Sequence, residues 1–207
     1  MRLIDRRKYI KKAPFRDATL FVLVCEGEVT EPEYFKFFDR LTKKVKVEVV
    51  PSRDGKSSPR HLFDNAREAA DRIKTGGDYW LWIILDTDRW GQQIRELQKL
   101  IRDQPNWKTA LSNPCFEVWL FNHFDSLIPP SQRNEKCKTW KQTLGEQLPG
   151  GFEPERHPSY LKQAIQKSKE NYIATGDVPE IGCTQVFELG EQLYELCKTV
   201  LEESESE

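Results

Sequence analysis

The chain has 207 residues, of which 31% are charged and 38% hydrophobic, and its formal net charge at pH 7 is −1. This length and composition fit one folded α/β domain with an added helical part. Because the charges nearly balance, a nucleic acid would have to be held by local basic patches rather than by the field of the whole molecule. No apolar run is long enough to span a bilayer and the N-terminus lacks a signal-peptide core, so we expect a cytoplasmic protein without membrane attachment.

The five cysteines are odd in number and form no C-x-x-C pair, which argues against both a zinc ribbon and a disulfide framework. They are Cys25, Cys115, Cys137, Cys183 and Cys197. Reduced thiols, as in a cytosol, fit this pattern best. The three histidines are too scattered to suggest a histidine-based metal site, and we expect His61 and His123 to be structural.

The first two thirds of the chain alternate between apolar runs and amphipathic segments. Residues 1–17 are rich in Lys and Arg and are predicted to be a basic N-terminal arm, and residues 18–128 are predicted to be the α/β core. Strands are expected at 19–25, 45–50, 79–85 and 108–112. Helices are expected from Thr30, from Pro59 after a Ser58 cap, at 91–103, and at 114–124 after an Asn113 cap. This alternation predicts a mostly parallel sheet flanked by helices.

Beyond residue 128 the sequence becomes more polar and richer in proline. Residues 129–201 are predicted to be a helical C-terminal part that packs on the core, with helices near 135–148, 159–173 and 185–201. The last of these helices has an apolar seam that suits docking onto the sheet better than a coiled coil, because it is too short for the latter. Residues 202–207 are acidic and are expected to be a disordered tail.

Acidic residues follow two of the predicted buried strands, at the points where these strands end. Glu26 ends the first strand, and Asp86 and Asp88 end the third. Ligands of an open parallel sheet bind beyond the carboxyl ends of its strands, and Mg²⁺ and Mn²⁺ prefer oxygen ligands. Gly27 removes a side chain where the backbone would approach a phosphate. We therefore expect these three carboxylates to bind Mg²⁺ or Mn²⁺; the alternative is that Glu26 caps the next helix and the aspartates solvate a turn.

Basic residues near these strand ends offer contacts for a phosphate backbone. Arg53, Lys56 and Arg60 follow the strand at 45–50 and are expected over the same crevice, with a solvated loop as the alternative. Arg89, next to the aspartates, is a candidate for stabilising a phosphate in the transition state. A glycine-lysine-serine run in this loop lacks the earlier glycine of a P-loop, so we do not expect the chain to bind ATP.

Several longer runs carry a family resemblance. They are VCEGE-x-TEP-x-YF at 24–35, LDTD at 85–88, SNPCFEVWL at 112–120 with a following His123-Phe124, and TQVF at 184–187. These runs resemble the RloB-like proteins, a prokaryotic family with a TOPRIM fold. The run at 112–120 is long and specific, and together the runs span nearly the whole chain.

The resemblance implies a TOPRIM-like sheet, a divalent metal, and phosphodiester chemistry like that of OLD-type nucleases and topoisomerases. Those relatives place a glutamate and an aspartate pair where Glu26, Asp86 and Asp88 fall in this sequence. The family also resembles the nuclease halves of prokaryotic anti-phage and abortive-infection systems, which are often paired with an ABC- or AAA-type ATPase.

One position departs from the pattern, because Trp90 stands where many TOPRIM proteins have a third aspartate. A second metal would then need another ligand, and Glu117 and Glu28 are the candidates. Glu117 could equally complement the dipole of its helix, and Glu28 could instead orient Glu26 or the start of the next helix. Asn113 is a candidate for a phosphate contact, with N-capping as the alternative.

The sequence thus predicts a metal-dependent nuclease that cuts DNA or RNA, with tRNA among the substrates left open. One or two ions would activate water for the attack; the alternative nucleophile is a tyrosine, of which Tyr34, Tyr79 and Tyr160 are candidates. A non-catalytic TOPRIM partner that regulates an ATPase is the second hypothesis, and nucleotidyl transfer is the third. The partners expected are the nucleic acid and an ATPase encoded nearby, and a homodimer stays open.

Overall fold

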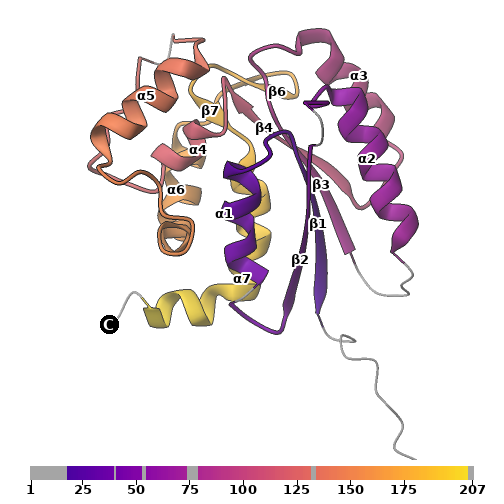
Figure 1. Cartoon of the computed structure of the whole chain (residues 1–207), viewed down its shortest axis with the longest axis horizontal. Coiled ribbons are helices and arrows are strands. Elements are labelled where there is room, and N and C mark those ends of the chain that lie inside the picture. Colours follow the sequence, from indigo (N-terminus) through magenta and orange to yellow (C-terminus); the bar gives the residue numbers. More distant parts are fainter. Residues whose placement is uncertain (1–17, 40, 53–54, 74–78, 132–133, 205–207) are drawn as a thin grey trace, which may run out of the picture.

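The computed structural model describes residues 18–39, 41–52, 55–73, 79–131 and 134–204. The basic arm predicted at 1–17 lies outside these residues. Within them the chain forms a mostly parallel sheet with helices on both faces and further helices at its C-terminal side (Figure 1). This architecture confirms the predicted fold class and is consistent with a TOPRIM-like sheet.

The sheet has five strands in the order β2-β1-β3-β4-β7. They are β2 (Val45–Pro51), β1 (Thr19–Cys25), β3 (Tyr79–Asp86), β4 (Trp107–Asn113) and β7 (Cys183–Thr184). The first four are parallel to their neighbours, and β7 is antiparallel to β4. The first strand, β1, lies inside the sheet, and the chain then adds β2 on one side of it and β3 on the other. The strand order therefore reverses between β1 and β3.

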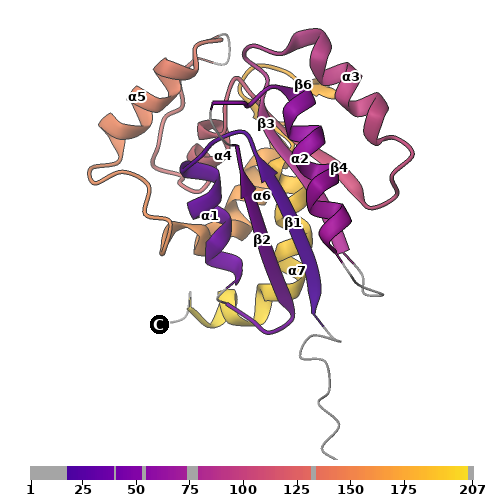
Figure 2. The same ribbon diagram turned by 45° about the vertical axis from the view of Figure 1, so that its right-hand side comes forward.

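The helices cover both faces of the sheet. They are α1 (Thr30–Asp39), α2 (Pro59–Arg72), α3 (Gly91–Ile101), α4 (Glu117–Phe121), α5 (Cys137–Gln147), the 3₁₀ helix η1 (His157–Tyr160), α6 (Leu161–Glu170) and α7 (Val186–Ser204). One face is covered by α2 and α3, and the other by α1 and α7 with α4 and α6 (Figures 1 and 2). The central strands consequently have no solvent-facing side.

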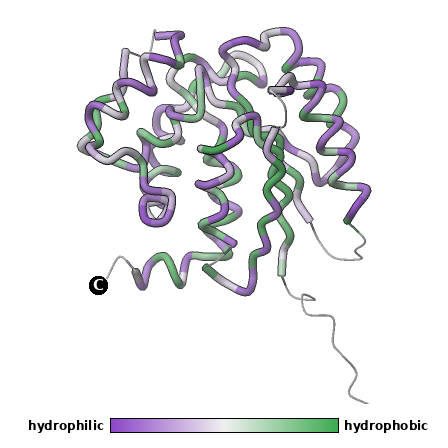
Figure 3. The backbone as a smooth tube through the Cα atoms, viewed as in Figure 1, coloured by the Kyte–Doolittle hydropathy of each residue, from purple (hydrophilic) through white to green (hydrophobic). Residues whose placement is uncertain are grey.

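This two-sided burial explains the continuous apolar sequence of the central strands. Along β1, Phe21 and Leu23 point into the core beneath α1 and α7, whereas Val22 and Val24 point into the core beneath α2 and α3. Successive side chains of a strand point to opposite faces, so both sets must be apolar. Each fully buried side chain of this kind contributes about 1.5–3 kcal/mol. The hydropathy of the backbone trace follows the same pattern, with the apolar stretches gathered in the strands (Figure 3).

The start of α2 follows the predicted chemistry. The Ser58 side chain accepts a hydrogen bond from the backbone N–H of His61 at 3.4 Å, and Pro59 occupies the first turn. The Ser58 hydroxyl also lies 2.8 Å from Nδ1 of His61. His61 is exposed and makes this local contact at the helix start, which agrees with the structural role expected for it.

The C-terminal part is less purely helical than predicted. It contains three strands of two residues each, β5 (Ala174–Thr175), β6 (Val178–Pro179) and β7. β7 joins the main sheet, where the hydroxyls of Ser112 and Thr184 lie 2.8 Å apart and Gln185 N donates to Leu111 O. Strands of two residues carry no periodicity to detect. In addition, α7 continues to Ser204, so the first three residues of the predicted acidic tail are helical.

Asn113 does not cap a helix, contrary to the prediction. It is the last residue of β4 and pairs with Cys183 of β7, so its backbone is extended by the sheet, and its side-chain amide donates to Pro179 O at 2.8 Å. The following peptide bond to Pro114 is cis. The short helix α4 starts only at Glu117. The predicted contact of Asn113 with a phosphate stays a prediction.

Among the helices within the described residues, none combines the length and the apolar character needed to cross a membrane.

His123 sits in the core beneath α1, with 1% of its surface exposed. Its Nδ1 lies 3.0 Å from Trp119 O, which can only accept, so Nδ1 carries the hydrogen. Nε2 is then free to accept from the Tyr34 hydroxyl at 3.0 Å. Burial lowers the pKa of His123 from 6.5 to about 3, because the charged imidazolium would lose its hydration. The neutral ring is thus part of the fold, as expected for a structural histidine.

Protonation of His123 should therefore lower the free energy of unfolding as the pH decreases. With its pKa depressed, His123 contributes stability that is fully present above pH 6.5 and is lost as the pH falls toward 3, since the unfolded chain binds the proton first. Between pH 7 and pH 5 this loss should be about 1–2 kcal/mol. Urea unfolding of His123→Gln should show a correspondingly smaller pH dependence, whereas His61→Gln, at an exposed site, should match the wild type. Equal pH dependence in wild type and His123→Gln would contradict this assignment.

Candidate metal centre

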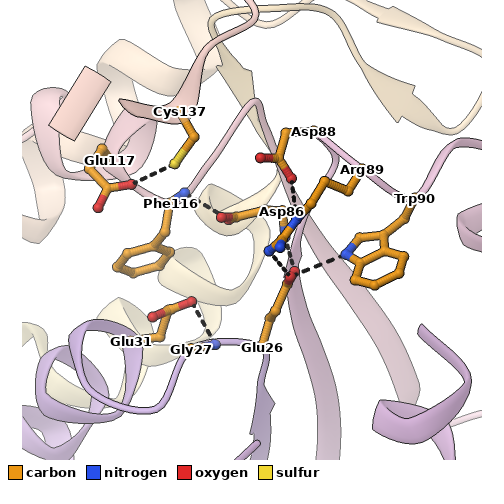
Figure 4. A network of polar contacts seen from close by, with 10 residues as sticks. All are labelled: Glu26, Gly27, Glu31, Asp86, Asp88, Arg89, Trp90, Phe116, Glu117 and Cys137. Carbon is orange, nitrogen blue, oxygen red and sulfur yellow. Dashed lines mark hydrogen bonds and ion pairs between the residues drawn. The ribbon is translucent and has the colours of Figure 1, made fainter. Parts of the chain in front are cut away.

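The predicted carboxylates of the first and third strands meet at the point where the strand order reverses. β1 and β3 pair in parallel with Cys25 opposite Ile84, so Glu26 and Asp86 come from adjacent strand ends. Glu26 N donates to Ile84 O, and Oε2 of Glu26 accepts from Asp86 N at 2.9 Å. The structure therefore brings Glu26 and Asp86 side by side. Figure 4 shows Asp86 between two groups of side chains, with Glu26 and Trp90 on one side and Glu117 on the other.

Glu26 is a buried carboxylate with donors on both oxygens. Only 6% of its surface is exposed. Besides the bond to Asp86 N, its Oε1 accepts from the Arg89 guanidinium at 3.2 Å and from Trp90 Nε1 at 3.1 Å. Burial raises the pKa of Glu26, and the hydrogen bonds and Arg89 oppose that rise. The alternative that Glu26 merely caps the next helix does not match these partners, since all three lie in or after β3.

Asp86 faces an even more negative environment. Its Oδ1 accepts from Phe116 N at 2.9 Å, which ties β3 to the segment before α4. Burial raises the pKa of Asp86 well above its usual value, and the nearby carboxylates of Glu31, Glu26 and Glu117 raise it further. In the part of the chain that the structure describes, no hydrogen bond occupies its second oxygen, Oδ2. Asp86 is thus positioned to ligate a cation that would offset this repulsion.

Asp88 and Arg89 form the outer edge of the group. Arg89 Nε donates to Asp88 Oδ1 at 3.3 Å, and the Arg89 side chain is 62% exposed. The guanidinium also lies 5.6 Å from the centroid of the Trp90 ring. Arg89 therefore pairs with two of the three predicted ligands, Glu26 and Asp88. Its predicted contact with a phosphate stays a prediction.

Glu31 belongs to the group although its position in the sequence did not single it out. It is 6% exposed, and its Oε1 accepts from Gly27 N at 3.1 Å. Burial raises the pKa of Glu31, and Glu117 and Glu26 add to that effect. Glu28, in contrast, is exposed, and among the described residues no hydrogen bond connects it to this group. Glu28 was expected to orient the start of α1. Glu31 does this instead, through its hydrogen bond from Gly27 N.

Gly27 faces the Glu31 carboxylate rather than open space. A Cβ at position 27 would overlap Oε2 of Glu31 and would lie 2.7 Å from Oε1. The space that Gly27 leaves near the strand end is thus occupied by a carboxylate of the same chain, and the expected approach to a phosphate stays a prediction.

Glu117 brings a further carboxylate and a thiol to the group. Glu117 is the first residue of α4 and is 7% exposed. Its Oε1 lies 3.8 Å from the Lys141 ammonium, and its Oε2 lies 4.0 Å from Sγ of Cys137. A hydrogen bond from the Cys115 thiol lowers the pKa of Cys137, and Lys141 acts in the same direction. The Glu117 carboxylate also raises the pKa of Asp86, so it lies near that predicted ligand, as its candidacy for a further ligand requires.

The basic residues predicted over the crevice are less well placed. Arg53 lies outside the described residues. Arg60, in the first turn of α2, pairs with Asp64 at 3.4 Å and lies 5.6 Å from the centroid of the Phe63 ring. Lys56 is exposed in the preceding loop. The solvated-loop alternative fits these contacts, and a role in phosphate binding stays a prediction.

The candidate tyrosine nucleophiles are also poorly placed. Tyr34 is 1% exposed, is hydrogen-bonded to His123, and has a pKa that burial raises far above 10. Tyr79 is the first residue of β3, seven residues from Asp86 and hence about 23 Å away at the strand rise. Tyr160 stacks on His157 at the end of η1. The buried, hydrogen-bonded Tyr34 and the distant Tyr79 thus give no support to a tyrosine nucleophile.

The residues present fit a divalent cation. Five carboxylates surround the ends of β1 and β3, while two cationic side chains, Arg89 and Lys141, pair with three of them. The carboxylates are Glu26, Glu31, Asp86, Asp88 and Glu117. Oxygen donors with an excess of negative charge suit Mg²⁺ or Mn²⁺.

Replacing Gly27 by Ala should destabilise the fold through Glu31. The new methyl group displaces the buried carboxylate and breaks its bond to Gly27 N, which should lower the free energy of unfolding by about 1–3 kcal/mol. Gly145→Ala is the matched control, because a Cβ there meets nothing within 4 Å and lies in helix α5. The double variant Gly27→Ala/Glu31→Ala should lose less than the sum of the two single changes in urea unfolding. Strict additivity would contradict the contact.

A protein-family model described as RloB-like protein matches residues 21–193 of the chain. This range contains both strand-end motifs, the run at 112–120 and the C-terminal motif that carry the resemblance. Searches of curated proteins and of solved structures give no match. The match covers most of the chain, and the protein therefore belongs to the RloB-like family.

Proposed function

We propose that this protein is a divalent-metal-dependent nuclease that hydrolyses phosphodiester bonds of nucleic acid. The observation that carries the proposal is the meeting of Glu26 and Asp86 at adjacent strand ends, where the strand order reverses. Burial raises the pKa of both carboxylates, and Glu26 adds to the rise at Asp86. A site of this kind, at the carboxyl ends of parallel strands, is where an α/β sheet binds its ligand.

Each residue of the group has a distinct task in this proposal. Asp86 and Asp88, with Glu26, would hold Mg²⁺ or Mn²⁺, which when bound supplies Lewis acidity for attack by water on a phosphate. The backbone N–H of Phe116 fixes the orientation of the Asp86 carboxylate. Arg89, which is largely exposed, can turn from Glu26 to a phosphate oxygen and offset its developing charge.

The biological setting is part of the proposal. Membership of the RloB-like family supports an effector role in an anti-phage defence system, because the family resembles the nuclease halves of such systems. A partner ATPase encoded nearby would fit the same role.

The direct test is cleavage of mixed nucleic acids in Mn²⁺ or Mg²⁺. Glu26→Gln keeps the shape of the side chain but removes its charge, so cleavage should fall by at least about 100-fold. Glu33→Gln is the matched control, since Glu33 is an exposed glutamate on α1, and it should cleave like the wild type. Gel analysis of the products with circular dichroism of each variant measures both outcomes. Undiminished cleavage by Glu26→Gln, or cleavage in excess EDTA, would overturn the proposal.

A second candidate is a non-catalytic partner that regulates a defence ATPase. The observation in its favour is that Glu26 already has donors on both oxygens and that one of them is Trp90, at the position of the missing third aspartate. Calorimetric titration with Mn²⁺ separates the two candidates. The nuclease predicts binding that Asp86→Ala abolishes, and the regulatory partner predicts no heat of metal binding in either protein.

A further inference from the structure

Two cysteines lie at the edge of the carboxylate group. Cys115 stands between β4 and α4 and is fully buried, and Cys137 is the first residue of α5 and is partly exposed. They are 22 positions apart in the chain, yet Cys115 Sγ lies 3.9 Å from Cys137 O. The two thiols and one carboxylate oxygen of Asp86 all lie within 4.8 Å of one another. The fold thus assembles a mixed sulfur and oxygen donor set that no sequence spacing indicated.

A fourth donor lies next to this set. Oε2 of Glu117 is 4.0 Å from Cys137 Sγ, on the side facing the group (Figure 4). In a tetrahedral zinc site, bonds of about 2.3 Å to sulfur and about 2.0 Å to oxygen put the donor atoms roughly 3.5–3.8 Å apart. The three donors lie within 4.8 Å of one another and Glu117 lies 4.0 Å from Cys137, so these separations exceed the tetrahedral values by about 1.3 Å at most, which small rotations of side chains can close. Three donors therefore lie near the spacing of a tetrahedral site, and the Glu117 carboxylate beside Cys137 is available for the fourth position.

Sulfur ligands change which cation this set selects. Mg²⁺ and Mn²⁺ are hard ions that take oxygen, whereas thiolates favour Zn²⁺ and ions of similar chemistry. Two sulfurs and two carboxylates therefore distinguish this set from the oxygen-only ligands Glu26 and Asp88. Cys183 and Cys197 have different surroundings: the Cys183 thiol donates to Asn171 O at 3.2 Å, and burial raises the pKa of Cys197 to about 11.

We propose that Asp86, Cys115 and Cys137, with Glu117 as the fourth ligand, form a site for Zn²⁺ or another thiophilic divalent cation. On binding, each thiol transfers its proton to solvent and its sulfur forms a bond to the cation. Lys141, one helical turn after Cys137, lies 3.8 Å from Glu117 and balances part of the negative charge that these steps create. The site shares Asp86 with the oxygen ligands and so provides a second cation position despite Trp90.

This inference does not depend on nuclease activity, because it concerns metal binding alone. The probe is Co²⁺, which replaces Zn²⁺ in tetrahedral sites and gives a sulfur-to-cobalt charge-transfer band when thiolates bind it. The wild type should show this band at one equivalent of Co²⁺. Added Zn²⁺ should remove the band, and a large excess of Mg²⁺ should leave it, since Mg²⁺ does not displace a thiolate-bound ion.

Variants locate the ligands. Cys115→Ser and Cys137→Ser should each lose the band and weaken Zn²⁺ binding by at least about 100-fold in competition with a chromophoric chelator. Cys183→Ser is the matched control, because the hydroxyl can keep the donation to Asn171 O, and it should bind like the wild type. Circular dichroism of each variant reports whether it folds.

A measurement on the unmodified chain covers the case in which a variant does not fold. Cys137 is partly exposed and should react with iodoacetamide in the metal-free protein, and one equivalent of Zn²⁺ should protect it. Peptide mass spectrometry identifies the modified cysteine. The proposal is overturned if the wild type gives no charge-transfer band, if the band survives in Cys137→Ser, or if Zn²⁺ leaves alkylation of Cys137 unchanged.

Discussion

The pairing of β1 with β3 is the constraint on which the candidate site depends. The two strands are more than fifty residues apart in the chain, yet their register places Glu26 beside Asp86 and lets the Glu26 carboxylate accept from Asp86 N. Both strands are buried on both faces, so their ends cannot shift without exposing two cores. The rigid centre of the molecule therefore holds these carboxylates close together although they repel one another.

The repulsion between these buried carboxylates explains why the site would bind a cation. Burial and neighbouring negative charge raise the pKa values of Glu26, Glu31 and Asp86, so each pays an energetic penalty when ionised. The chain offsets part of this penalty with Arg89, Lys141 and backbone N–H groups. A divalent cation would offset the rest and would bind to residues that are already in place. Preorganisation of this kind is what distinguishes a ligand site from a set of exposed acidic residues.

Much of this could be read from the sequence, because long patterns carry it. Apolar runs predicted β1 and β3, and their polar ends predicted where Glu26 and Asp86 would meet. Short features, and contacts between distant parts of the chain, could not be predicted from the sequence. The two-residue strand β7 has no periodicity, and Asn113 pairs with that strand instead of capping a helix. Glu31 was missed because its partner is a backbone N–H, and the contact between Cys115 and Cys137 depends on how α5 packs, which no local spacing encodes.

The central claim is that the carboxylates at the ends of β1 and β3 bind a divalent cation. The most direct measurement is anomalous diffraction from crystals of the protein grown with Mn²⁺. The account predicts an anomalous peak within bonding distance of the Asp86 carboxylate, with Glu26 or Asp88 as a further ligand and Arg89 turned away. The account would be contradicted by a map in which these side chains are well ordered, no anomalous peak lies near Asp86, and Glu26 still accepts hydrogen bonds from Arg89 and Trp90.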